Sequence, residues 1–316
     1  MISLRFLFLC VLFFPCCVTA SSPTTFEQAK RASKQVYADY RHTFYCNCPI
    51  NWSGFSGKAD LVACNYKIRK DAQRANRVEW EHVMSAHSFG QQRPCWRQGG
   101  RKNCVATDRI FRQMEADMYN LVPSVGEVNG DRSNFRFGIL PSTPYQHGQC
   151  PVKIDFQQRV IEPRTEIRGQ IARIYFYMHD RYNLSMSRQQ EQLFVAWNKQ
   201  YPVSDWEKLR NQRIARIMQH TNPYVTGEKE WVIGDRNQKD ELSKNAASKT
   251  LEQEKINSEL AEVDNELPIR GNKNSKVYHL PIGCPSYDAM KNSNIVKFNS
   301  EREARESGYR KAGNCL

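Results

Sequence analysis

Two carboxylates and an imidazole lie almost side by side in RVEWEHV, the run at residues 77–83 of a mostly basic chain. In an extended strand successive side chains point to opposite faces, so Glu79 and Glu81 would share one face while His82 lies on the other. Glu81 and His82 can therefore act on one molecule only if the strand ends or bends at this point. The loop-like SAHSFGQQRP that follows is consistent with such an end.

A carboxylate beside an imidazole suits metal-assisted hydrolysis, because the carboxylate oxygen can hold a hard cation while the imidazole takes a proton from water. The alternative is an ordinary surface pair, which is what most Glu-His dipeptides are. A zinc-peptidase motif is excluded by spacing: it needs His-Glu-x-x-His, whereas here Glu precedes His and the next histidine is His87.

The first 20 residues, MISLRFLFLCVLFFPCCVTA, have the pattern of a secretory signal peptide. The apolar run from Leu4 to Phe14 is followed by small residues, so cleavage is expected after Ala20. This run is too short to span a bilayer, and no other segment approaches the roughly 20 apolar residues that spanning requires. Lipid anchoring at Cys16 or Cys17 is the alternative, for which the preceding Phe-Pro is a poor context. We expect a soluble protein in the periplasm or outside the cell.

The charge balance predicts a polyanionic partner. The chain has 46 Lys and Arg against 33 Asp and Glu, a formal charge of +13 at pH 7. An exported basic protein is expected to bind nucleic acid, acidic glycans or anionic membrane surfaces. Charge alone does not choose among these.

Eight cysteines follow the expected leader, an even number that indicates disulfides in an exported chain. Cys46 and Cys48 pair poorly with each other, because a disulfide needs Cα atoms about 5.5 Å apart and converging side chains. We expect them to bond to Cys64 and Cys150, in an order that stays open. A zinc site built on CNC and Cys64 is the alternative, but the usual spaced cysteine pairs are missing.

A more local pair is expected between Cys95 and Cys104. These residues bracket CWRQGGRKNC, in which Gly99 and Gly100 would let the chain reverse its direction.

Apolar periodicity predicts a mainly helical domain over residues 21–228. Helices are expected over 26–40, 107–121 and 164–181, after an N-cap at Ser187, and after a Ser204/Glu207 capping box. Strand-like pieces are limited to YKIRK and RVEWE, and VPSVGEVNGDRSN reads as turn-rich. A charged linker over 229–268 and a small module over 269–316 complete the predicted organisation.

Longer runs resemble a known family. FYCNCPINW, RVEWEHVMSAHSFGQQRPCWRQGGRKNC, MEADMYNLVPSVGEVNGDRSNF, IARIYFYMHDRYNLS and QLFVAWNKQYPVSDWE follow one another as in the bacterial endonuclease I family, over about residues 26–225. The resemblance implies an α+β fold: a mainly helical nuclease domain with a ββα-metal (His-Me finger) site. The charged linker and a small α+β C-terminal module would follow it.

The resemblance also implies roles for single residues. His82 would be the general base that activates water, and Arg101 would steady the phosphate. Glu81 and Asn129 would hold one divalent cation, expected to be Mg²⁺ and replaceable by Ca²⁺ or Mn²⁺. Glu79 is expected to be structural.

Further contacts to nucleic acid are expected from basic residues near these motifs. The candidates, besides Arg101, are Lys102, Arg132 and Arg136. Contacts of this kind would bind the phosphate backbone without reading sequence.

The predicted function is that of an exported, Mg²⁺-dependent, non-specific endonuclease, expected to be monomeric, that hydrolyses DNA and RNA to 5′-phosphate products. The alternative is a secreted basic nucleic-acid-binding protein that kept the fold but lost catalysis. The presence of the base, both ligands and the arginine favours the enzyme.

The last residues resemble the small zinc-binding module of the Ada DNA-repair protein, through GNKNSKVYHLPIGCPSY and FNSEREARESGYRKAGNC. That module holds zinc with four cysteines, whereas the matching positions here are His279, Cys284, Ala312 and Cys315. We therefore expect a Cys284–Cys315 disulfide in place of zinc, with a degenerate metal site as the alternative. A binding role, to nucleic acid or an envelope partner, is expected.

Overall fold

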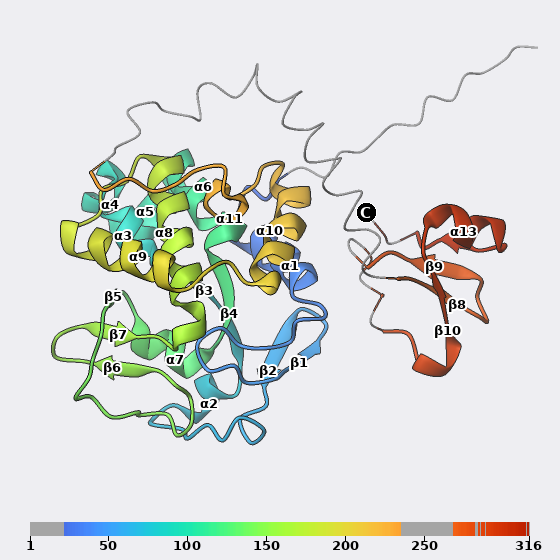
Figure 1. The fold of residues 1–316 in the computed structure, drawn as a ribbon, viewed down its shortest axis with the longest axis horizontal. Coiled ribbons are helices and arrows are strands. Elements are labelled where there is room, and N and C mark those ends of the chain that lie inside the picture. Colours follow the sequence, from blue (N-terminus) through green and yellow to red (C-terminus); the bar gives the residue numbers. More distant parts are fainter. Residues whose placement is uncertain are drawn as a thin grey trace, which may run out of the picture.

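The protein is described by a computed structural model (Figure 1). It describes residues 22–234 and 268–315, apart from positions 282, 283, 285, 288 and 314. The expected leader and most of the expected linker lie outside the described residues. The two described parts have separate hydrophobic cores.

The first part contains both helices and small sheets. Its elements are α1 Phe26–Val36, β1 Ile50–Ser53, β2 Ser56–Ala59, α2 Ala72–Ala75, β3 Val78–His82, α3 Ala86–Gly90, α4 Pro94–Arg97, α5 Gly100–Thr107, α6 Arg109–Glu115, η1 Met118–Asn120, β4 Leu121–Val125, α7 Gly126–Arg132, β5 Arg136–Phe137, β6 Lys153–Asp155, β7 Val160–Glu162, η2 Thr165–Ile167, α8 Arg168–Tyr182, α9 Arg188–Gln200, α10 Asp205–Met218 and α11 Pro223–Thr226.

The β3–β4 ladder lies inside this part, next to α7 (Figure 1). The two strands are antiparallel, with His82 opposite Leu121 at one end and Val78 opposite Val125 at the other. Every residue of β4 is buried, and α7 begins directly after Val125. The strand that carries the Glu-His pair thus ends at His82, as the sequence suggested.

The structure corrects the prediction for residues 107–132. The expected helix over 107–121 stops at Glu115, because buried Asp117 accepts a hydrogen bond from the backbone N–H of Tyr119 and starts a short 3₁₀ turn. The run VPSVGEVNGDRSN, read as turns, supplies most of β4 and all of α7. Its Gly, Asn and Asp residues are typical of turns, so the local sequence did not predict the strand and the helix that tertiary packing stabilises.

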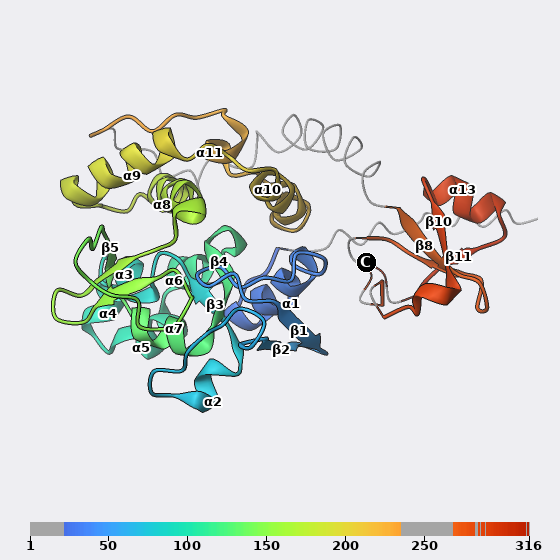
Figure 2. The same ribbon diagram turned by 60° about the horizontal axis from the view of Figure 1, so that its bottom comes forward.

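The expected long helices are present and form a layer of α8, α9 and α10 (Figure 2). Ser187 and Ser204 cap α9 and α10, as predicted. The carboxylate of Glu207 does not complete a capping box but pairs with buried Arg173 on α8, at 2.6 Å. The layer is therefore held by a buried ion pair as well as by apolar packing.

Four disulfides have the partners that the sequence allowed. Cys46 bonds to Cys150 and Cys48 to Cys64, which resolves the order left open. Cys95 bonds to Cys104, and Cys284 to Cys315. Gly99 and Gly100 both have positive φ, so the chain reverses between Cys95 and Cys104 as expected.

Residues 229–234, assigned to the linker from sequence, pack on the first part. The Trp231 ring stacks on Phe176, with centroids 4.8 Å apart. Its indole N–H and the backbone N–H of Gly234 both donate to Glu191. The folded part therefore continues at least to residue 234.

The second described part is a small α+β unit. Its elements are β8 Ile269–Asn272, β9 Val277–His279, η4 Asn292–Asn294, β10 Ile295–Phe298, α13 Glu301–Glu306 and β11 Arg310–Lys311, with strand order β10-β8-β9-β11. Tyr278, Phe298 and Ala304 lie in its core. His279 lies beside the Cys284–Cys315 disulfide. One imidazole nitrogen of His279 and the two sulfur atoms lie within 4.8 Å of one another.

In the described ranges of the chain, no helix combines the length and the apolar character needed to cross a bilayer.

Candidate active site

An open cleft of about 990 Å³ runs along β3. Its walls come from α1, the β1–β2 hairpin, α5 and α7, so segments far apart in sequence meet there. The four residues expected to act as base, metal ligands or phosphate contact, which are Glu81, His82, Arg101 and Asn129, line it together. Glu79 and Arg132 line it as well. Glu81 and His82 reach the same cleft from neighbouring positions because β3 ends at His82.

His82 is buried, and its position fixes which ring nitrogen is basic. Nε2 lies 2.9 Å from the backbone carbonyl of Glu115, an acceptor only, so Nε2 carries the proton and Nδ1 is free of one. The ring packs against Phe26, with centroids 4.6 Å apart. Burial lowers the pKa of His82 to about 3, and the imidazole is therefore neutral near pH 7.

Glu81 is a buried acid with one engaged oxygen. Its Oε1 accepts the Tyr45 hydroxyl at 3.1 Å and lies 3.0 Å from Nη1 of Arg132. Among the described residues, no side chain or backbone group donates a hydrogen bond to Oε2. Burial raises the pKa of Glu81 to about 7, although Arg132 and Tyr45 act in the opposite direction. A cation at Oε2 would favour the ionised form.

Asn129 is oriented by Glu79. Its Nδ2 donates to Oε2 of Glu79 at 2.9 Å, which leaves the amide oxygen for another partner. Glu79 also accepts hydrogen bonds from Arg74 and Arg77. Burial acts to raise the pKa of Glu79, but these arginines outweigh it and hold the pKa below its usual range. Glu79 is thus an ionised carboxylate held between two arginines and the Asn129 amide.

Arg101 lies on α5 and is joined to the same cluster through Glu115. Its Nε donates to the Glu115 carboxylate at 2.5 Å, while the backbone carbonyl of Glu115 holds His82. The Arg101 side chain is 49% exposed, so part of its guanidinium faces the cleft. Glu115 therefore positions both a neutral imidazole and a partly exposed cation.

Arg132, expected to contact nucleic acid, lines the same cleft but is almost fully buried. Its side chain is 1% exposed. The guanidinium donates to the backbone carbonyls of His82 and Val83 and pairs with Glu81. Because these contacts point inward, Arg132 links the end of α7 to the end of β3.

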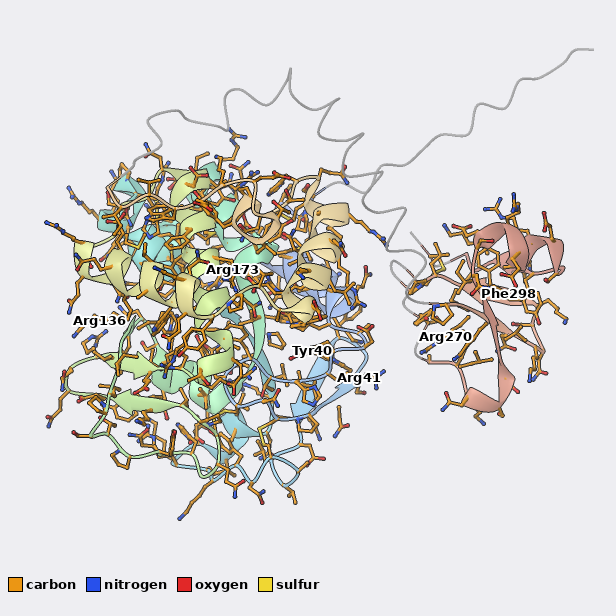
Figure 3. The ribbon with its side chains drawn as sticks, in the orientation of Figure 1. Tyr40, Arg41, Arg136, Arg173, Arg270 and Phe298 are labelled. Carbon is orange, nitrogen blue, oxygen red and sulfur yellow. A yellow bond between two sulfur atoms is a disulfide. The ribbon has the colours of Figure 1, made fainter. Side chains whose placement is uncertain are left out.

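Two other basic candidates lie outside the cleft lining. Lys102 is exposed on α5, next to Arg101. Arg136 is exposed on β5, at the left edge of the first part in Figure 3. The structure does not bring these two side chains to the cluster around His82.

Two residues of this cluster were missed from sequence, Glu115 and Tyr45. Glu115 acts mainly through a backbone carbonyl, for which a side-chain pattern gives no signal. Tyr45 lies next to Cys46 in FYCNCPINW, and the Cys46–Cys150 disulfide ties that segment into the core. Only the three-dimensional approach of Tyr45 to Glu81 indicates its role.

Fold and cleft together define the class of protein. It is an α+β protein in which a neutral imidazole, oxygen donors and a partly exposed arginine meet in one cleft, an arrangement suited to hydrolysis. The chain belongs to the endonuclease I family, whose sequence model matches residues 24–228. The last part of the chain, residues 229–316, lies outside this match.

Named relatives cover the same region. The chain is 50% identical over 202 residues to an extracellular deoxyribonuclease of Aeromonas hydrophila, covering 64% of this chain and 88% of the relative. It is 46% identical over 207 residues to a periplasmic deoxyribonuclease of the same organism, covering 65% and 87%. It is 43% identical over 226 residues to Endonuclease-1 of Buchnera aphidicola subsp. Baizongia pistaciae, covering 69% and 92%.

Proposed function

We propose that this protein is an exported, metal-dependent endonuclease that hydrolyses phosphodiester bonds of DNA and RNA with little sequence preference. Membership of the endonuclease I family and the extracellular and periplasmic deoxyribonucleases among its relatives support export and nuclease activity. The observation that carries the mechanism is the meeting of His82, Glu81, Asn129 and Arg101 in one cleft.

His82 is the general base. The hydrogen bond from Nε2 to the Glu115 carbonyl leaves Nδ1 as the proton acceptor, and the low pKa keeps it unprotonated. Nδ1 takes the proton of a water molecule as that water attacks phosphorus, with the 3′ oxygen as leaving group. Positioned acid–base groups of this kind typically contribute about 10²–10⁴-fold to rate.

Glu81 and Asn129 fit a hard divalent cation. Each has one side-chain oxygen that accepts no hydrogen bond from the described residues, and carboxylate and amide oxygens are ligands that Mg²⁺ accepts. When bound, the cation would offset the negative charge that grows on the phosphate and the leaving oxygen. Glu79 holds the Asn129 amide so that its oxygen is the free atom. Arg101 binds a phosphate oxygen through the part of its guanidinium that Glu115 does not occupy.

The test is cleavage of supercoiled plasmid and of single-stranded RNA by the chain from residue 21, with Mg²⁺ and with EDTA. We expect degradation with Mg²⁺ that EDTA abolishes and that His82→Ala lowers by about 10²-fold or more. Nucleic-acid binding without cleavage in the presence of any divalent metal would contradict the enzyme function and favour the alternative, a nucleic-acid-binding protein without catalysis. Retention of full activity in the correctly folded His82→Ala variant would remove His82 as the base.

A further inference from the structure

One large apolar side chain at the rim of the cleft is exposed to solvent, and the hydrolytic cluster does not explain its exposure. Phe55, at the tip of the β1–β2 hairpin, lines the cleft and is 71% exposed. Large apolar side chains exposed to this extent lose the stabilisation of burial. An exposed aromatic ring beside a binding cleft indicates a ligand with a flat ring that can stack on it.

The hairpin tip is held in a defined place. Gly54 has a φ of +52° and forms the tight turn together with Phe55. The ammonium group of Lys34, on α1, donates to the Gly54 carbonyl and lies 5.8 Å from the Phe55 ring. Figures 1 and 2 both show α1 beside the β1–β2 hairpin. The ring is therefore presented by an anchored turn.

The same hairpin is packed on the strand that carries the hydrolytic residues. Trp52 of β1 stacks on Trp80 of β3, with centroids 5.9 Å apart and planes at 16°. A Cβ added at Gly57 would lie 2.7 Å from the Trp52 ring and 3.1 Å from Val78, so the packing is close. Phe55 is thus fixed relative to His82 through two tryptophans.

Positive charge accompanies the exposed ring. The guanidinium carbon of Arg31 lies 5.6 Å from the Phe55 ring centroid, and Arg31 is exposed and lines the cleft. Phe26, five residues earlier on α1, touches His82. Helix α1 therefore contacts both the hairpin tip and the histidine of the hydrolytic cluster.

We propose that Phe55 and Arg31 form a stacking subsite for an unpaired nucleobase of the substrate, in the same cleft as His82. Phe55 provides the face on which the base stacks, and Arg31 contacts the adjoining phosphate. Single-stranded DNA and RNA are recognised by aromatic side chains and arginines in this way, because every base has a π-face. In a continuous duplex the bases are stacked on one another and do not reach Phe55.

This inference rests on the proposed function for its kinetic readout, so its first test is binding. Labelled single-stranded oligonucleotide and its blunt duplex are titrated into the chain from residue 21 that carries His82→Ala, with and without Phe55→Ala, and fluorescence anisotropy is measured. We expect Phe55→Ala to weaken single-strand binding about tenfold or more and to change duplex binding by less than about twofold. Phe55→Trp should keep the single-strand affinity.

A matched control is Phe156→Ala. Phe156 is 40% exposed and has an arginine over its ring, Arg69 at 4.5 Å, but it does not line the cleft. Its loss should leave both affinities unchanged. Unaltered single-strand affinity in Phe55→Ala, or an equal loss on both nucleic acids, overturns the subsite.

The kinetic arm separates the two proposals. In the otherwise unaltered protein, Phe55→Ala should lower kcat/KM on the single strand about tenfold and leave the duplex value within about twofold. If the unaltered protein cleaves nothing but the binding difference is present, the nuclease function fails and the subsite stands. If it cleaves and Phe55→Ala changes neither rate nor affinity, the subsite fails and the nuclease stands.

Discussion

Arg101 and Lys102 are neighbours in the chain but have different surroundings. Arg101 lines the cleft and contacts Glu115, whereas Lys102 is exposed on another face of α5 and does not line the cleft. We expect Arg101→Ala to lower kcat by about 10²–10³-fold, the usual effect of removing one donor to a developing negative charge. Lys102→Ala should retain kcat within about twofold.

Single-turnover cleavage of one labelled oligonucleotide measures both variants, and thermal unfolding shows whether they are folded. Equal losses in Arg101→Ala and Lys102→Ala would mean that general charge, not position in the cleft, decides the effect.

Arg132 is expected to act on stability. Its guanidinium is buried against Glu81 and the carbonyls of His82 and Val83. Arg132→Met leaves Glu81 buried without its cation, and removing one partner of a buried pair typically costs about 3–5 kcal/mol. Urea unfolding should show that loss.

The comparison variant is Arg136→Met, which removes the same charge from an exposed position on β5. It should change the free energy of unfolding by no more than about 0.5 kcal/mol. Unchanged stability in Arg132→Met, together with a lower salt dependence of DNA binding, would return Arg132 to the role of a phosphate contact.

At the scale of elements, α7 holds Asn129 at the cleft by packing tightly at its first residue. A Cβ added at Gly126 would lie 2.4 Å from the backbone oxygen of Arg74 and 2.9 Å from Oε1 of Glu79. Gly126→Ala must therefore shift the start of α7 and disturb the carboxylate that orients Asn129. We expect a loss of about 1–3 kcal/mol in stability and a clear fall in kcat.

Gly313→Ala is the control, because a Cβ there meets no atom within 4 Å. Urea unfolding and plasmid cleavage test both variants. Full activity in Gly126→Ala would show that the position of Asn129 does not depend on this contact.

At the scale of the whole molecule, the functional unit is expected to end after residue 234. Trp231 stacks on Phe176, and Glu191 accepts two hydrogen bonds from residues 231 and 234. A chain of residues 21–234 should cleave DNA like the full chain. One that ends at residue 228 should be less stable by roughly 1 kcal/mol, because the partly buried Trp231 and its contacts are lost.

Thermal and urea unfolding of the two truncated chains, with plasmid cleavage in parallel, provides the measurement. Equal stability of the two would place the boundary at 228, as the sequence suggested. Loss of cleavage in the 21–234 chain would give the C-terminal module a part in the hydrolysis.

The sequence by itself determined what depends on local chemistry. Residue types and order placed the Glu-His pair at the end of a strand and allowed the four disulfide partners. Helical periodicity and serine caps predicted α9 and α10, because these features follow from hydrogen bonds a few residues apart.

Tertiary structure alone decided what depends on groups distant in the chain. β4 and α7 form from a segment rich in Gly, Asn and Asp because packing outweighs local propensity there. The same reason separates Arg132, buried on Glu81, from Arg101, open to the cleft. It also lets a backbone carbonyl of Glu115 select the basic nitrogen of His82. A one-dimensional pattern lists possible partners, but only folding determines which of them become buried together.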